Sequence, residues 1–413
     1  MKIAVVGGGS TYTPELIDGF ARLAPFASEI VLLDPAADRL AVVGAFARRV
    51  LEHHGSAARL RWTADVDDAL RGASTVVIQL RVGGQAARIS DETFPLVCDC
   101  VGQETTGAGG LAKALRTVPV VLDIARRADP GAWIVNFTNP VGIVTRALLD
   151  DGHRAAGLCN VAIGFQRRFA AQLGVDPSAV VLDHVGLNHL TWERAAYVDG
   201  VDRLPALLTS HLDELADLVQ IPRGVLSSLR NVPSYYLRYF YCHDTVVREE
   251  KGQPTRGEKV AGIEHELLRM YADPALTTKP DLLGQRGGAF YSEAAVGLIA
   301  SLHQDDGGIH AVNVRNRGFL PFLSDDAVIE VTCRVGAAGA TALPAPPLRP
   351  ELAGLVGAVS AYEELAVEAA LHGGRDRVYR ALLAHPLVGQ HDAADTLTDE
   401  LLTANRDHLG WLS

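Results

Sequence analysis

The chain has 413 residues, of which 48% are hydrophobic and 21% are charged, and its net charge is −11. This length allows two or three domains with a deep cleft between them. The acidic balance, with Lys and Arg spread along the chain, argues against a nucleic-acid partner, which requires a clustered basic face. No stretch approaches the ~18 apolar residues of a membrane span, so no membrane partner is expected either.

The N-terminus and the cysteines indicate the compartment. The first residues, MKIAVVGGG, have neither the longer apolar core nor the cleavage site of a signal peptide. The five cysteines are odd in number and lack the spacing of a disulfide framework. We therefore expect reduced thiols in a cytoplasmic protein.

The first part of the chain alternates short apolar runs with helical patterns. The expected strands are residues 2–6, 29–34, 75–80 and 132–137. The expected helices include residues 13–23, 36–52 and 110–127. Thr13 is predicted as the N-cap of the first helix, with Pro14 following it. Strands that alternate with helices predict right-handed βαβ units. The predicted fold class is α/β, with a Rossmann-like doubly wound parallel sheet over residues 1–160.

The pattern changes in the second part, residues 161–413. Residues 179–199 favour strands, and residues 350–408 are mainly helical. Between them we expect helices at 204–220, 257–272 and 289–303 and strands at 308–314 and 326–334. This part is predicted to be a mixed α/β domain for catalysis, substrate binding and oligomerisation.

A glycine turn follows the first expected strand. Gly7 and Gly9 allow a sharp turn and a close approach of backbone N–H groups to a pyrophosphate, at the start of a helix. The third glycine of the GxGxxG pattern is replaced by Tyr12. Asp34, at the end of the second strand, fits a carboxylate that bonds a ribose 2′-hydroxyl, which favours NAD over NADP. The alternative is an α/β turn that binds no nucleotide.

Several residues further along can carry chemistry. Cys159 and His189 could share a divalent transition metal, although their spacing matches no zinc finger and both could be core residues. The tyrosines of residues 231–241 could pack an interface; one could act as a base if a metal or cation lowered its pKa. Arg88 and Arg286 lie near glycines and could bind phosphate, or could be ordinary surface arginines.

Taken together, the motifs resemble glycoside hydrolase family 4 over nearly the whole chain. The similar segments are GGGSTYTPEL (7–16), RVGGQAARISDE (81–92), GQETTGAGG (102–110), NFTNPVGIVT (136–145), LCNVAIG (158–164), GLNHL (186–190), YLRYFY (236–241) and QRGGAFYS (285–292). This family is NAD-dependent and departs from the usual two-carboxylate mechanism. Asn160 after the cysteine resembles the 6-phospho-β-glucosidase branch, whereas Ala162 stands where that branch usually has proline.

The resemblance implies a role for each matching residue. Cys159 and His189 would bind the metal, for which the resemblance implies Mn²⁺, and Tyr236 would be the catalytic base, with Gln103 tuning that tyrosine. The residues expected to bind the substrate are Arg88, Asn139, Asn160 and Arg286. The residues expected to bind NAD are Gly7, Gly9, Ser10, Thr11 and Asp34. The leaving-group acid is undefined, because Asn160 stands where α-specific members place a proton donor.

The implied reaction is a redox-assisted elimination on a phosphorylated glycoside. NAD⁺ would oxidise C3 of the sugar, Tyr236 would remove the C2 proton, the aglycone would leave C1, water would add, and hydride would return to C3. The products would be glucose 6-phosphate and the aglycone. The resemblance also implies a homodimer or homotetramer.

Three alternatives remain open from the sequence. The first is a member of the same family that acts on an unphosphorylated or α-linked sugar. The second is an NAD-dependent 2-hydroxy-acid dehydrogenase, although His189 lies in LNH and not in a GxHG-like setting. The third is a non-catalytic NAD sensor, which would have no need for a base or a metal.

Overall fold

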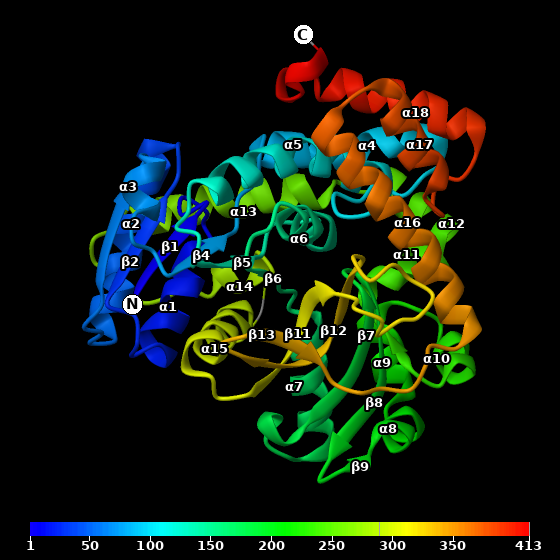
Figure 1. The fold of residues 1–413 in the computed structure, drawn as a ribbon, viewed down its shortest axis with the longest axis horizontal. Helices are drawn as coiled ribbons and strands as arrows, with labels where there is room; N and C mark the ends of the chain where they lie inside the picture. The colour runs from blue at the N-terminus through cyan, green and yellow to red at the C-terminus, as the bar shows by residue number, and fades with distance from the viewer. Residues whose placement is uncertain (289, 413) are drawn as a thin grey trace.

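The structure is a computed structural model that describes residues 1–288 and 290–412. These residues contain one 13-stranded sheet with the order β10-β8-β7-β12-β11-β6-β5-β4-β1-β2-β3, and β9 and β13 pair with β8 and β12 (Figure 1). The parallel strands are β1 (Lys2–Val6), β2 (Glu29–Leu33), β3 (Arg59–Thr63), β4 (Thr75–Ile78), β5 (Trp133–Asn136) and β6 (Ala155–Gly157). The antiparallel strands are β7 (Val181–Leu187), β8 (Leu190–Val198), β9 (Val201–Asp202), β10 (Val232–Pro233), β11 (Gly308–Arg315), β12 (Val328–Gly336) and β13 (Gly339–Ala342).

The parallel strands have the order of a doubly wound nucleotide-binding sheet. Read from one edge, that order is β3-β2-β1-β4-β5-β6, so the direction of winding reverses between β1 and β4. The predicted fold class, a Rossmann-like parallel sheet joined to mixed α/β structure, is confirmed. The predicted domain boundary at residue 160 lies between β6 and the next helix, inside a continuous sheet, and the two-domain division stays a prediction.

Helices cover the sheet in both parts of the chain. Up to residue 173 they are α1 (Thr13–Leu23), α2 (Ala37–His53), α3 (Val66–Leu70), α4 (Gly84–Thr93), α5 (Gly107–Arg126), α6 (Val141–Asp150) and α7 (Val161–Leu173). Those that follow are α8 (Leu204–Ser210), α9 (Leu212–Val219), α10 (Arg223–Leu229), α11 (Arg238–Tyr241), α12 (His243–Lys251), α13 (Arg256–Tyr271), α14 (Leu282–Gln285), α15 (Tyr291–Gln304), α16 (Pro350–His372), α17 (Arg375–Ala384) and α18 (His391–Ala404). In the described residues no helix is long and apolar enough to cross a membrane.

The C-terminal helices return to the N-terminal half. In Figure 1, α16 to α18, drawn in orange and red, lie beside α4 and α5, and all three contact α5. One buried apolar cluster also runs through strands of both halves, including Val76 of β4, Val135 of β5 and Val331 of β12. This shared core holds the sheet together and stabilises the edge where the candidate site residues lie.

Several predicted elements need correction. The predicted helix over 204–220 is two helices, because the chain breaks at His211 between α8 and α9. The N-cap prediction at Thr13 is wrong: Thr13 is the first helical residue, Tyr12 is the N-cap, and the Thr13 hydroxyl accepts a hydrogen bond from Gln79 Nε2 at 2.8 Å. The predicted helix over 289–303 corresponds to α15, and its first residue, Ala289, lies outside the described residues.

Candidate active site

The predicted site residues follow the carboxyl ends of the parallel strands. Gly7 follows β1, Asp34 follows β2, Asn139 closely follows β5 and Cys159 closely follows β6. Parallel strands end at the same edge of a sheet, and ligands of doubly wound sheets bind there, near the point where the winding reverses. Residues separated by more than 150 positions in the chain therefore share one edge of the fold.

The glycine turn after β1 is packed too tightly for other residues. Gly7 has a φ of 82°, and a Cβ atom there would lie 2.8 Å from the Gln79 carbonyl oxygen. The Gly9 N–H donates to Asp34 Oδ2 at 3.0 Å, and a Cβ atom at Gly9 would lie 2.9 Å from that carboxylate. The structure thus brings the glycine turn and Asp34 together in the arrangement that a dinucleotide requires.

Ser10, Thr11 and Arg286 form a second cluster on this turn. Arg286 donates to Glu264 Oε1 at 2.9 Å and to Ser10 Oγ at 3.2 Å, and Thr11 Oγ1 donates to Glu264 at 3.2 Å. Arg39 also pairs with Glu264, at 3.2 Å. Arg286 was predicted to contact the substrate. The structure places it against the segment that follows the glycine turn, where Glu264 balances its charge.

Cys159 lies two residues before α7, and several hydrogen-bond donors lie near its sulfur. The backbone N–H groups of Asn160 and Val161 and the side chain of Asn188 all donate to it. Burial and then the nearby Glu330 carboxylate raise the pKa of the free thiol. The three donors nevertheless favour a thiolate once a cation is beside it, because they stabilise negative charge on sulfur.

His189 lies at the tip of the hairpin between β7 and β8. Leu187 pairs with Leu190, so Asn188 and His189 form a two-residue turn, and His189 has a φ of 63°. A non-glycine residue rarely adopts this conformation, and such strain is typical of functional sites. Burial lowers the pKa of His189 to about 4, so the ring is neutral and can bind a metal. Its Nδ1 atom lies 2.9 Å from Thr105 Oγ1.

Tyr236 stacks directly on His189. The two ring centroids are 3.5 Å apart with an interplanar angle of 10°. Tyr236 is half-buried, in a short 3₁₀ turn (Tyr235–Leu237) before α11. Burial, and then the neighbouring Cys159, raise the pKa of its phenol well above the usual range. Tyr236 is therefore protonated in the metal-free protein, and a cation beside it is needed to make it a base.

Gln103 contacts a different tyrosine from the one that the sequence suggested. Its Nε2 atom donates to the Tyr239 hydroxyl at 2.7 Å, and its Oε1 atom accepts from Thr105 Oγ1 at 3.4 Å. Thr105 in turn contacts His189. Gln103 is thus linked to Tyr236 through Thr105 and the stacked imidazole of His189. Any effect of Gln103 on the pKa of Tyr236 would therefore be indirect.

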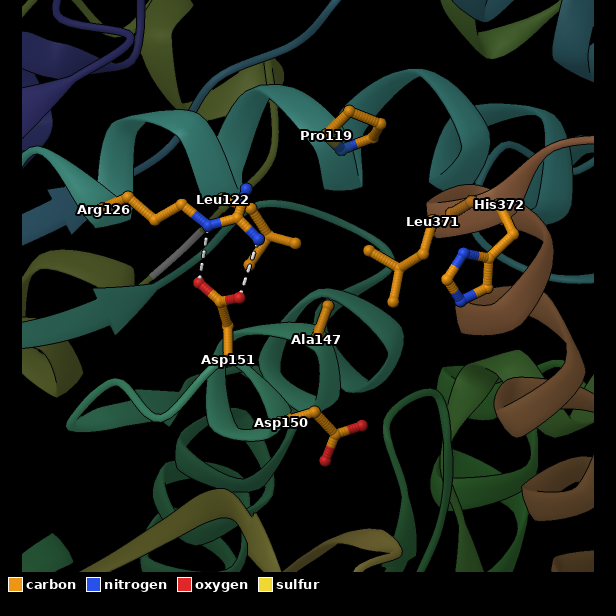
Figure 2. Close-up of a pocket in the computed structure, with 9 residues that line it drawn as sticks. Pro119, Leu122, Arg126, Ala147, Asp150, Asp151, Leu371 and His372 are labelled. Atoms are coloured by element: carbon orange, nitrogen blue, oxygen red, sulfur yellow. Dashed lines mark hydrogen bonds and ion pairs between the residues drawn. The ribbon is translucent and has the colours of Figure 1, made fainter. Parts of the chain in front are cut away.

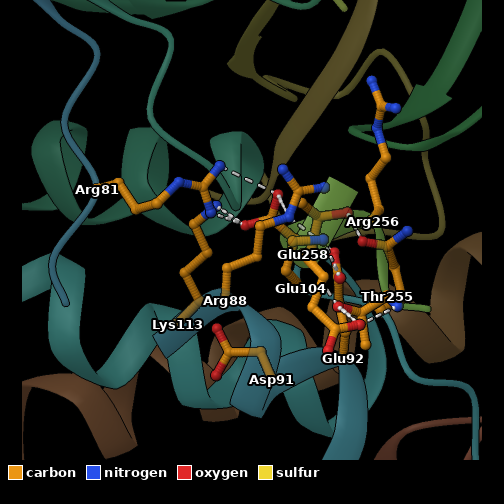
Figure 3. A network of polar contacts seen from close by, with 12 residues as sticks. Arg81, Arg88, Asp91, Glu92, Glu104, Lys113, Thr255, Arg256 and Glu258 are labelled. Carbon is orange, nitrogen blue, oxygen red and sulfur yellow. Dashed lines mark hydrogen bonds and ion pairs between the residues drawn. The ribbon is translucent and has the colours of Figure 1, made fainter. Parts of the chain in front are cut away.

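A buried carboxylate, Glu104, organises three cations at this edge (Figure 3). Lys113 Nζ lies 2.6 Å from Glu104 Oε2, Arg88 Nε lies 3.2 Å from Oε1, and Arg81 donates to both oxygens. Arg88 also donates to Glu92 at 2.7 Å. Burial opposes ionisation of Glu104, but the three cations outweigh it and hold its pKa well below the usual range. Three cations against two carboxylates leave a net positive region.

The two asparagines that were predicted to bind the substrate lie in the segments that follow β5 and β6. Asn139 precedes Pro140 through a cis peptide bond, and its Oδ1 atom is buried with no hydrogen-bond partner among the described residues. Buried polar atoms usually have partners, so this oxygen is suited to accept from a ligand hydroxyl. Asn160 is the N-cap of α7, next to Cys159. Asn160 is thus next to Cys159 in the chain, and Asn139 follows β5 at the same edge of the sheet.

A separate hollow of about 390 Å³ lies between α5, α6 and α16 (Figure 2). It contains none of the predicted site residues. Its lining includes Leu122 and Leu371, and its Arg126 and Asp151 side chains already pair with each other through two hydrogen bonds of 2.9 and 2.7 Å. Asp150 in the same lining pairs with Arg146 and Arg315, so both carboxylates of the hollow already have partners.

Other residues at the site carried no recognisable signal in the sequence. Thr105 and Glu104 were inside a matching segment but had no assigned role. Tyr291 donates to the Leu158 carbonyl at 3.0 Å, and the neighbouring Cys159 adds to the burial that raises its pKa. Glu330 enters from β12, more than 130 residues beyond His189. Only the pairing of β12 with β7 brings it close, and one sequence does not reveal that pairing.

Known proteins resemble this chain along its whole length. Residues 2–175 match the model of family 4 glycosyl hydrolases, and residues 184–388 match that family's C-terminal domain. The probable 6-phospho-β-glucosidase of Bacillus subtilis is 36% identical, covering 99% of this chain and 97% of that protein. The phospho-α-glucosidase PagL of Clostridium acetobutylicum is 29% identical over 98% of both chains.

A solved structure resembles this chain to a similar degree. The 6-phospho-β-glucosidase of Thermotoga maritima, solved with manganese, NAD⁺ and glucose 6-phosphate, superposes with a TM-score of 0.91. It is 33% identical and covers 99% of both chains. Likeness at this level extends through both the parallel and the antiparallel parts of the sheet, and so through the whole edge described above.

Proposed function

This chain belongs to the family 4 glycosyl hydrolases, and on that basis we propose that it hydrolyses 6-phospho-β-glucosides to glucose 6-phosphate and an aglycone. Its similarity to proteins named for the β-linkage, at 36% identity, exceeds the 29% identity to a protein named for the α-linkage. The net positive region around Glu104 supports a substrate with a phosphate group, because arginine and lysine bind phosphate through charge-assisted hydrogen bonds.

The observation that carries the proposal is the stack of Tyr236 on His189 next to Cys159. This arrangement holds a phenol that could become a base beside two side chains that could ligate a metal. A hydroxy-acid dehydrogenase needs one base, for the hydroxyl proton, and removes no proton from carbon, so it has no need for a second base such as Tyr236. A protein that only senses NAD would need neither group.

The residues present fit both cofactors. The glycine turn leaves no room for a Cβ atom at Gly9, and Asp34 is fixed there by the Gly9 N–H, as a cradle for NAD requires. Cys159 and His189 offer a sulfur with three donors and a neutral imidazole, which suit a divalent transition metal such as Mn²⁺. Among the described residues no group of three His, Cys, Asp or Glu side chains could hold a metal, so further ligands would come from elsewhere, such as the sugar oxygens.

When bound, NAD would supply hydride acceptance and return at C3 of the sugar, and the metal would supply Lewis-acid polarisation of the sugar oxygens. The protein's own residues would do the rest. The Tyr236 oxygen would take the proton from C2, which acidifies once C3 is oxidised, and the aglycone would then leave C1. Asn139 Oδ1 would accept from a sugar hydroxyl, and the Arg88 guanidinium would hold the substrate. Water would then supply the hydroxyl group at C1 and a proton at C2, and the proton held by Tyr236 would pass to the departing aglycone oxygen. With the hydride returned at C3, the hydrolysis would be complete.

The experiment is a release assay with p-nitrophenyl β-glucoside 6-phosphate under reducing conditions, with NAD⁺ and Mn²⁺ added singly and together. We expect nitrophenol release only with both, and no net NADH. Tyr236→Phe should lower kcat by roughly 10²–10⁴-fold, whereas Tyr197→Phe, a control on an exposed ring of β8, should leave it unchanged. Cleavage of the α-linked or unphosphorylated analogue alone would show that the proposed substrate is wrong. Steady NADH production from a hydroxy acid would show that the proposed reaction is wrong.

A further inference from the structure

A buried carboxylate outside the predicted site lies behind both candidate metal ligands. Glu330, on β12, is 1% exposed. In the sheet it lies opposite Asn313 of β11 on one side and Gly186 of β7 on the other. Both of its oxygens are occupied: Oε1 lies 3.0 Å from His184 Nε2, and Oε2 accepts from Asn188 Nδ2 at 2.9 Å and Asn313 Nδ2 at 2.8 Å.

The contacts of Glu330 continue to a second buried carboxylate. His184 Nδ1 lies 2.7 Å from Glu193 Oε1, and His184 and Glu193 are cross-strand partners between β7 and β8. Three ionisable side chains thus lie in line across β8, β7 and β12. Even a fully paired network of buried charges often adds no more stability than apolar residues of similar volume, so stability alone does not explain this one.

The network ends on Asn188, which joins the two candidate metal ligands. One amide hydrogen of Asn188 is directed to Glu330 Oε2. The same side chain lies within reach of the Cys159 sulfur and acts to lower the pKa of its thiol. Asn188 is also the first residue of the hairpin turn whose second residue is His189, in its strained left-handed conformation. The orientation of one amide therefore affects the sulfur and the imidazole together.

We infer that Glu330 is a positioning residue of the metal site, which fixes the Asn188 amide so that it donates to the Cys159 sulfur and holds the hairpin turn that presents His189. The inference rests on the proposed function, because it takes Cys159 and His189 as the metal ligands. Groups that orient metal ligands in this way tune affinity without touching the metal.

The chemistry of a carboxylate explains why this residue suits the role. An amide has a donor end and an acceptor end, and rotation by half a turn exchanges them. A carboxylate only accepts, so Glu330 selects the amide orientation in which the Asn188 nitrogen points inward. With that partner removed, Asn188 can present its carbonyl oxygen to the sulfur. That oxygen repels a thiolate, and the hairpin turn loses its anchor to β12.

Two variants distinguish the effect of the position of the Glu330 carboxylate from the effect of its charge. Glu330→Ala removes the anchor. Glu330→Asp keeps the carboxylate and its charge beside His184 but shortens the side chain by one carbon–carbon bond, about 1.5 Å, so it no longer reaches Asn188. Asp18→Asn is the matched control: Asp18, in α1, is also buried and lies 2.8 Å from a histidine nitrogen, Nε2 of His54.

The measurement is binding of Mn²⁺ by calorimetry, together with the near-ultraviolet charge-transfer absorption of the Co²⁺-loaded protein, which reports a thiolate bond to cobalt. NAD affinity of each full-length variant checks that the fold is intact. In the wild type the Co²⁺ band should be present, and Cys159→Ser should remove it. If the wild type shows no such band, the metal site of the proposed function is wrong, whatever Glu330 does.

Given the wild-type band, Glu330→Ala and Glu330→Asp should each weaken Mn²⁺ binding by about 10- to 100-fold and reduce the Co²⁺–thiolate band, with NAD affinity unchanged. Asn188→Ala should do the same, and adding Glu330→Asp to it should produce no further loss, because both changes act through one amide. Mn²⁺ binding as tight as in the wild type in Glu330→Asp, or losses that multiply in the double variant, would overturn the positioning role. Asp18→Asn should bind Mn²⁺ as the wild type does.

Discussion

Replacement of Glu104 by glutamine removes the one negative charge that three cations share. The change preserves the shape of the side chain, but it leaves Lys113, Arg81 and Arg88 without their common partner at a residue that is 5% exposed. Removal of one partner from a buried ion pair costs about 3–5 kcal/mol. Lys113 limits the loss, because burial, and then Arg81, already lower its pKa to about 8, so it can release its proton near neutral pH. We therefore expect the lower end of the range, about 3 kcal/mol.

The assay is thermal and urea unfolding of Glu104→Gln beside the wild type. A loss of ~3 kcal/mol corresponds to a fall in Tm of roughly 3 °C for a chain of this length. Because the folded pKa of Glu104 is depressed, its contribution is present above the unfolded value of about 4.3 and is lost as the pH falls through the folded value. The difference between the two proteins should thus be largest near pH 6, shrink in acid, and narrow again toward pH 8, where Lys113 loses its proton more readily in the variant.

The matched control is Glu29→Gln. Glu29 also pairs with two arginines, Arg59 and Arg61, each at 2.9 Å, but near the surface. Its loss should cost less than about 1 kcal/mol, as for exposed ion pairs. Equal effects of the two changes, or a stabilised Glu104→Gln, would refute the view that Glu104 is the structural centre of the cationic cluster.

Three further changes test other parts of the site. Gly9→Ala places a Cβ atom against Asp34 and should weaken NAD binding by roughly 10- to 100-fold, for ~1–3 kcal/mol of overpacking; fluorescence titration with NADH measures it, and an unchanged affinity would mean that the cofactor does not approach this turn. Asn139→Ala removes a buried oxygen without a partner in the described structure, so KM should rise while Tm stays within ~1 °C; a lower Tm with an unchanged KM would make the residue structural. Burial disfavours a charged His184, but the Glu193 and Glu330 carboxylates outweigh it and raise its pKa to about 10, so its stabilising effect is complete below about pH 6.5 and declines toward pH 10. Urea midpoints from pH 6.5 to 9.5 should fall for the wild type and stay flatter for His184→Gln, and parallel curves would show that the ring is not the group that titrates.

The parts of the fold that depend on residues close together in the chain could be predicted from the sequence. The apolar runs at β1, β2, β4 and β5 and the glycine turn are local signals, so a parallel sheet and the place of Asp34 at the end of β2 could be predicted from them, whereas the strand order could not. Strand β3 was missed because its arginines give it the pattern of a polar edge strand, in which only Leu60 is buried. The break at His211 and the cap at Tyr12 depend on packing that no local pattern records.

The candidate site was predictable only in part, for the same reason. Cys159, His189 and Tyr236 were identified through family motifs, and the structure brings them together. The partner of Gln103 was not evident, because motif order does not show which of several tyrosines a side chain reaches. Glu330 had no signal at all, since its part in the site arises from strand pairing across the sheet. The oligomeric state and the cytoplasmic location stay predictions.

The central claim is that Tyr236 removes the proton from C2 of the sugar during hydrolysis. It is tested most directly by cleavage of a 6-phospho-β-glucoside in D₂O with NAD⁺ and Mn²⁺, followed by NMR of the glucose 6-phosphate formed. The account predicts solvent deuterium at C2 of the product, because the C2–H bond breaks before water adds at C1. Complete hydrolysis with only protium at C2 would contradict it and would assign the bond cleavage to direct displacement at C1.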